Sequence, residues 1–166
     1  MRKILGVSAA LVLLSACGGP DAEETIETDE GDVEYSADVD GDDVTIDMTG
    51  PDGETVSVRS GAEASGDLPA GFSVYPDATV VTSTNVNTPD GGGTVIVMTT
   101  DATPAEVVAY YREQAEAAGV TIASEATMNG MMLIGGEGED GTAFSASASP
   151  GGDGQTSIQL SVGKGF

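Results

Sequence analysis

Apolar and polar residues alternate in short runs through most of the chain after residue 33. In residues 33–62, three runs are separated by Asp40-Gly41-Asp42 and Pro51-Asp52-Gly53, which are typical turn sequences. This pattern predicts a β-meander with one apolar face. Three short strands are marginal alone, so the meander must pack against or pair with something else. The alternating apolar residues are Tyr35, Ala37, Val39, Val44, Ile46, Met48, Val56 and Val58.

Residues 72–166 carry strand patterns around one helical pattern. Thr103, Pro104 and Glu106 form a capping box with proline at the first helical position, and Gly119 is a typical stop, which predicts a helix over Thr103–Ala118. The order ββαββββ predicts an α+β fold, with one helix covering one face of an antiparallel sheet whose outer face is rich in serine. The strand patterns are Thr79–Val86, Thr94–Thr100, Val120–Met128, Met131–Gly135, Thr142–Ser149 and a last run through Ile158, Leu160 and Val162.

The predicted helix has one apolar stripe, formed by Val107, Val108, Tyr111, Ala115 and Ala118. Tyr111 lies four residues from both Val107 and Ala115, so these three share a face. We expect Tyr111 at the centre of the contact with the sheet.

The remaining segments read as connections. Residues 17–32 are rich in Gly, Pro, Asp and Glu, with Ile26 as the single large apolar residue, which predicts an acidic tether without regular structure. Residues 63–71, rich in Ala, Ser and Gly, read as a linker.

The first residues resemble the signal of bacterial lipoproteins. Met1-Arg2-Lys3 precedes an apolar run too short to span a bilayer, and Leu14-Ser15-Ala16-Cys17 resembles a lipobox with the chain's single cysteine. The resemblance implies that residues 1–16 are removed and that Cys17 is acylated, for example with palmitate, anchoring the protein to the cell envelope. Enterobacterial lipoproteins that stay at the inner membrane carry an aspartate next to the lipidated cysteine, whereas Cys17 is followed by Gly18-Gly19. By this analogy the outer membrane is favoured, with the protein facing the periplasm. The alternative is a secretory signal with an incidental cysteine.

The last ninety residues also carry a resemblance. Tyr75-Pro76-Asp77-Ala78, the start Thr100–Pro104 and the Glu-Val-Val-x-Tyr-Tyr helix from Glu106 to Gly119 are similar to a pattern in small bacterial envelope lipoproteins. The arrangement is also similar to the helix-grip domains of an outer-membrane β-barrel assembly lipoprotein. These motifs imply helix packing and no chemistry.

The charge is strongly acidic and uneven. The chain has 28 Asp and Glu against 5 Lys and Arg, for a formal net charge of −23. Beyond the signal, only Arg59, Arg112 and Lys164 are basic, so nucleic acid is disfavoured as a partner. A basic envelope protein and divalent cations are the partners that the charge allows, and a merely solubilising surface is the alternative.

Known catalytic arrangements are mostly absent. The chain has no His and no Trp, which excludes Ser-His-Asp triads, Cys-His pairs and histidine metal sites. Lys164 is too near the end to hold a Ser-Lys nucleophile, and no phosphate-binding loop occurs. Paired carboxylates for glycoside hydrolysis stay open, but the chain has few aromatic platforms for sugars. We therefore predict a non-enzymatic protein without a cofactor.

Two groups of residues suggest a metal. Asp38, Asp40 and Asp42 imitate the opening of an EF-hand loop, but Asp43 stands where that loop needs glycine and Thr49 where it needs glutamate. A hairpin turn is the competing interpretation. A thioether copper site could be formed by Met128, Met131 and Met132, with Met98. The favoured interpretation is that these methionines fill the core. The sequence thus predicts an envelope-anchored interaction or structural module, with low-affinity binding of a divalent cation or small ligand as the alternative.

Overall fold

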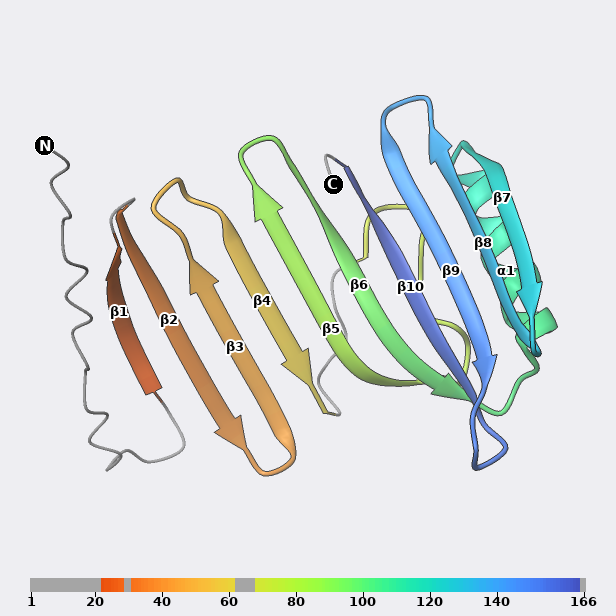
Figure 1. Ribbon diagram of the computed structural model, residues 1–166, viewed down its shortest axis with the longest axis horizontal. Helices are drawn as coiled ribbons and strands as arrows, with labels where there is room; N and C mark the ends of the chain where they lie inside the picture. Colours follow the sequence, from red (N-terminus) through yellow and green to blue (C-terminus); the bar gives the residue numbers. More distant parts are fainter. Residues whose placement is uncertain (1–21, 29–30, 62–67, 165–166) are drawn as a thin grey trace, which may run out of the picture.

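The computed structural model describes residues 22–28, 31–61 and 68–164, and these form one antiparallel sheet with one helix. The ten strands lie in the order β1-β2-β3-β4-β5-β6-β10-β9-β8-β7, and the helix α1 lies behind the β7–β9 end (Figure 1). The predicted α+β class, with a single helix on one face, is confirmed. In the described part of the chain, no helix is both long and apolar enough to cross a membrane. Cys17 and the predicted signal lie outside the described residues.

The element bounds agree closely with the sequence patterns. The strands before the helix are β1 (Ala22–Thr28), β2 (Gly31–Asp40), β3 (Asp43–Thr49), β4 (Thr55–Ser60), β5 (Thr79–Thr88) and β6 (Gly91–Thr100). The helix and the strands after it are α1 (Pro104–Ala117), β7 (Val120–Met128), β8 (Met131–Gly138), β9 (Thr142–Pro150) and β10 (Thr156–Lys164).

The first strand corrects one prediction. Within residues 17–32, where no regular structure was expected, Ala22–Thr28 forms β1 and pairs with β2 along its whole length. A neighbouring strand supplies backbone partners, so even an acidic segment with little apolar area is ordered as the outermost strand.

The meander pairs with the later domain at its edge. Its three predicted strands are β2, β3 and β4, and β4 continues into β5 through pairs from Thr55↔Asn87 to Ser60↔Thr82. The predicted linker therefore connects two neighbouring strands of one sheet, without interrupting it. Residues 62–67 lie outside the described part.

The core lies between α1 and the sheet. The helix contacts β7, β8 and β9, and Val107, Tyr111 and Ala115 are fully buried. From the sheet, the core takes alternate residues of its last strands, which share the helix side: Ile96, Met98, Ile134, Phe144, Ala146, Ala148, Ile158, Leu160 and Val162. The face assignment of Tyr111 is thus confirmed, whereas Ala118 is exposed at the C-cap and does not belong to the buried stripe.

The helix and one hairpin end as their sequences predict. The capping box is complete, since the Glu106 amide donates to Thr103 Oγ1 and the Thr103 amide donates to the Glu106 carboxylate. The Asn129-Gly130 turn has φ of 51° and 83°, both positive as a type I′ turn requires.

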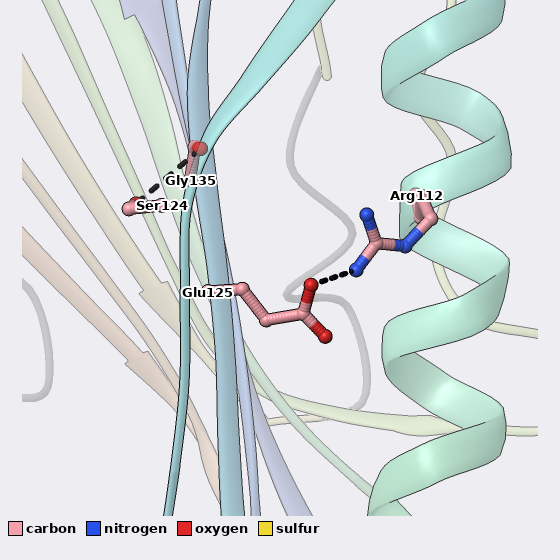
Figure 2. A network of polar contacts seen from close by, with 4 residues as sticks. All are labelled: Arg112, Ser124, Glu125 and Gly135. Atoms are coloured by element: carbon pink, nitrogen blue, oxygen red, sulfur yellow. Dashed lines mark hydrogen bonds and ion pairs between the residues drawn. The ribbon is translucent and has the colours of Figure 1, made fainter.

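A bulge in β7 brings one side chain of this strand into contact with the helix. Ile122 pairs with Gly136 but Ser124 pairs with Gly135, so Ala123 is the extra residue and the strand changes phase. The change turns Glu125 toward α1, where its carboxylate accepts a 2.7 Å hydrogen bond from Arg112 (Figure 2). Beside the bulge, Ser124 Oγ donates to the Gly135 carbonyl. The sequence pattern did not predict this bulge.

A second bulge, in β5, has a larger consequence. Val80 pairs with Met98 and Thr82 with Val97, so Val81 is extra and 43% exposed. Directly paired residues point to the same side of a sheet. Before the bulge, Val80 faces the helix side; after it, Ser83 does so and Val86 faces away. Because β2–β4 follow the phase of β5, their apolar residues lie on the side opposite the helix.

Candidate functional site

The helix side of the sheet carries a groove next to the helix-covered core. It has a volume of about 770 Å³, within the range of small-molecule sites. The groove lies over β3–β6 and the last residues of β10, and Leu68 and Pro69 form part of its wall. The segment after Pro69 is held to the core because Phe72 stacks on Phe144 with ring centroids 5.4 Å apart.

Most side chains that line the groove are polar, although apolar atoms provide slightly more than half of its exposed surface. Alternate residues of four strands point into the groove, and the β5 bulge sets their phase. Its polar lining residues are Asp47, Thr49, Thr55, Ser57, Arg59, Asn85, Asn87, Thr94, Thr142 and Lys164. At the floor, Gly92 faces Asn87 and Lys164 in the neighbouring strands. A Cβ on Gly92 would lie 2.5 Å from the Val86 carbonyl oxygen, so the floor must stay without a side chain.

A chain of hydrogen bonds fixes the amide on the core side of the groove. Thr94 Oγ1 donates to Asn85 Oδ1 at 2.7 Å, and Asn85 Nδ2 donates to Ser83 Oγ at 3.5 Å. Ser83 and Thr94 are buried. Ser57 Oγ is also out of solvent reach, and among the described residues it has no hydrogen-bond partner. The groove therefore offers hydroxyl and amide groups, with Asn85 held in one orientation.

The groove holds two of the three cationic side chains that the structure describes. Lys164 is paired with Asp140, and this hydrogen bond is the main reason why the pKa of the Asp140 carboxyl falls to about 2. Arg59 has no carboxylate within 4.0 Å among the described residues. Asp47 lies on the same side of the sheet, and its pair with Ser57 is two pairs along from that of Arg59 with Thr45. The groove thus presents a guanidinium and a carboxylate, and no ion pair joins the two.

The space beneath α1 is filled. Tyr111 is fully buried, its hydroxyl lies 3.8 Å from Met98 Sδ, and burial is the main cause that raises its pKa. Tyr75 and Tyr110 pack edge to face beside it, with centroids 5.0 Å apart. The core beneath α1 is therefore filled, and two hollows lie next to it on this side: the groove over β3–β6 and a more open one between α1 and β7, lined by Arg112, Glu116 and Val120 among others.

The predicted metal residues are only partly brought together. Asp38 and Asp40 lie on the same side of β2 and line a small hollow with Asp43, Thr45 and Arg59, whereas Asp42 lies in the hairpin turn and does not line it. Within residues 22–28, 31–61 and 68–164, no group of three or more acidic, cysteine or histidine side chains could hold a metal. Met98 is in the core, and Met128 is 64% exposed. The predicted lipidation residue Cys17 lies outside these residues.

Comparison with known families supports the fold. A family model described as START domain-like matches residues 80–159, just under half of the chain. The matched stretch runs from β5 into β10 and includes α1, and it excludes β1–β4. At the level of the fold, this match supports the helix-grip resemblance that the sequence shows. Comparison with curated proteins and with solved structures gives no match.

Sequence reasoning did not find the groove. Arg59, Asn85 and Asn87 are separated along the chain and stand in ordinary strand patterns. The available signal was the polar residues that alternate with apolar ones in Thr55–Arg59 and Thr82–Asn87. These residues could not be identified as a site, because the side of the sheet on which they lie depends on the bulge at Val81.

Proposed function

We propose that this chain is a lipid-anchored envelope lipoprotein whose described domain binds a small polar ligand without catalysing a reaction. The anchor is Cys17 of the lipobox-like sequence, and the binding site is the groove over β3–β6. The observation that carries the proposal is the combination of the groove's size and Arg59, which has no carboxylate within 4.0 Å among the described residues although Asp38, Asp40 and Asp43 line a hollow with it. A guanidinium at the wall of such a groove can bind a ligand that carries an acidic group.

The lining also indicates the ligand's general character. Arg59 and Asp47 offer one positive and one negative group, and the other polar side chains offer hydroxyls and amides. This set suits a compact molecule that combines hydroxyl or zwitterionic groups with an apolar part, for which Leu68 and Pro69 offer surface. In a chain of net charge −23, a ligand with several negative charges would be repelled.

The ligand can be tested with the full chain purified from its own membranes. Mass spectrometry of the small molecules released on denaturation should find one that is stoichiometric with the protein. Asn87→Trp should fill the groove and remove it, whereas Thr88→Trp, on the next residue and the opposite side of the sheet, should retain it. Absence of such a molecule from the native protein, or its equal retention by both variants, would contradict the proposal.

The anchor needs a separate test. Radiolabelled palmitate should be incorporated into the native chain in cells and should be absent from Cys17→Ala. Label retained by the variant would reject Cys17 as the acylated residue, without bearing on the groove.

A basic envelope protein is a second candidate partner. On the helix side of β1–β4, eight acidic residues share one face: Glu23, Glu27, Asp32, Glu34, Asp38, Asp40, Asp43 and Asp47. Crosslinking in cells should capture a basic protein in a complex that high salt dissociates, because exposed charges are screened. A complex insensitive to salt would contradict this attraction.

A further inference from the structure

The side of the sheet opposite α1 is almost free of charge. Following the pairs from strand to strand, the ionisable residues on this side are Glu24, Tyr35 and Glu137, among all ten strands described. The same chain carries 28 acidic residues, eight of them on the helix side of β1–β4 alone. A surface kept neutral in so acidic a chain is suited to contact another protein surface.

On β2–β4 this neutral side is almost wholly apolar, and on β5 and β6 it carries Val86, Val95 and Val97 next to the threonines Thr82, Thr84 and Thr88. Its side chains are mostly β-branched, and most are only half-buried because no second layer covers them. We call this surface the outer apolar face; it consists of Val33, Tyr35, Ala37, Val39, Val44, Ile46, Met48, Val56, Val58, Val86, Val95 and Val97. Beyond it, β9 and β10 present serines such as Ser145 and Ser161.

We infer that the outer apolar face binds a second copy of this chain, sheet against sheet. Five strands at about 4.8 Å spacing and about eight residues at roughly 3.4 Å give a flat area of roughly 650 Å². With the relief of its side chains, this approaches the ~800 Å² per partner of a standard interface. Two such faces are self-complementary under a two-fold axis, and β-branched side chains interdigitate in sheet-on-sheet packing.

Charge favours a second copy of this chain over a basic protein or a bilayer as the partner of the outer apolar face. A basic protein would bind the acidic helix side, because the outer apolar face has no acidic residue within it. A bilayer fits poorly, since Tyr35 is the single interfacial anchor of this face and no Trp, Lys or Arg lies on it. Two copies of a chain with net charge −23 repel wherever acidic surfaces meet, and the outer apolar face is the side on which they can meet without opposing carboxylates.

The test is crosslinking of the full chain in its own membrane with a short bis-maleimide. Ile46→Cys and Val58→Cys place a thiol on the outer apolar face, and their neighbours Thr45→Cys and Ser57→Cys place it on the helix side. Cys17 is common to all four variants. We expect a dimer of this chain from the first pair and none from the second pair. Equal dimer yields from both pairs would overturn the proposal.

A second measurement keeps the test decisive if one of these cysteine variants folds poorly. Val95→Cys serves as the reporter, combined with Ile46→Glu on the outer apolar face or Thr45→Glu on the helix side. The dimer should be lost with Ile46→Glu and retained with Thr45→Glu. Two results would overturn the second copy as occupant: a crosslink of Val95→Cys to a different protein, or protection of its thiol from a water-soluble maleimide without any dimer.

Discussion

The two ends of the sheet use the same alternating pattern to different effect. In β9 and β10, and at alternate positions of β6 and β8, apolar residues lie on the α1 side of the sheet, where residues such as Ile96 and Leu160 are fully buried. In β2–β4, an equally regular alternation leaves every described residue half-buried or exposed. Ile26 is 51% exposed and Val39 is 40% exposed. An apolar strand face thus forms a core only when another layer covers it.

The difference also separates the two kinds of surface. The helix-covered end coincides with the START domain-like match, and its interior is filled. The meander end has no helix, so one of its sides carries the acidic residues and part of the groove, while the other carries the outer apolar face. The variants below test this contrast.

The largest effect should come from the aromatic residue at the centre of the helix contact. Tyr111→Ala should lower the free energy of unfolding by about 3–5 kcal/mol, as for other buried aromatic truncations. Tyr110, which is partly exposed and bonds to Ser73 Oγ at 2.9 Å, should lose far less on the same change. Urea melts of both variants measure this. Equal losses would mean that the two tyrosines contribute alike and that α1 does not pack as described.

Two isoleucines compare the ends of the sheet directly. Ile96→Ala should cost about 2–5 kcal/mol because it leaves a cavity in a closed core. Ile46→Ala should cost about 1 kcal/mol, since water already reaches that side chain in a single copy. Urea melts in dilute solution, where copies are apart, give both values. A larger loss for Ile46→Ala would show that the meander has a covered core of its own.

The helix cap should have a smaller effect. Thr103→Ala removes the acceptor of the Glu106 amide and should cost about 1 kcal/mol. Thr103→Ser keeps a hydroxyl and should restore most of the stability. Thermal or urea unfolding compares the two. If Thr103→Ser were as unstable as Thr103→Ala, the loss would come from methyl packing rather than from the cap.

The smallest effect concerns the ion pair at the end of β10. The pKa of Asp140 is about 2 in the folded chain, below its ordinary 3.8, mainly because Lys164 donates to it. Since the folded pKa is depressed, the stabilisation is complete above the unfolded pKa and is lost as pH falls from about 4 toward 2. NMR titration of the carboxyl should show its pKa rising toward 3.8 in Lys164→Gln. An unchanged pKa would assign the shift to the hydroxyl and amide of Thr142 instead.

The local elements of this protein could be predicted from its sequence. Thr103, Pro104 and Glu106 start α1, Asn129-Gly130 closes a hairpin, and period-two alternation marks most strands. These features depend on residues a few positions apart, whose hydrogen bonds and dihedral preferences act locally. The order of elements around one helical pattern was enough to indicate an α+β fold.

The tertiary structure alone decided which side each apolar face occupies. A one-residue bulge reverses every side chain that follows it, and nothing in the run through Val80, Val81 and Thr82 specifies where the extra residue lies. The bulge at Val81 turns Asn85 and Asn87 into the groove and Val56 and Val58 away from α1. Likewise, β1 forms because β2 offers a free edge, which the composition of Ala22–Thr28 cannot reveal. Pairing between distant strands fixes these features, so the groove and the outer apolar face exist only in the assembled sheet.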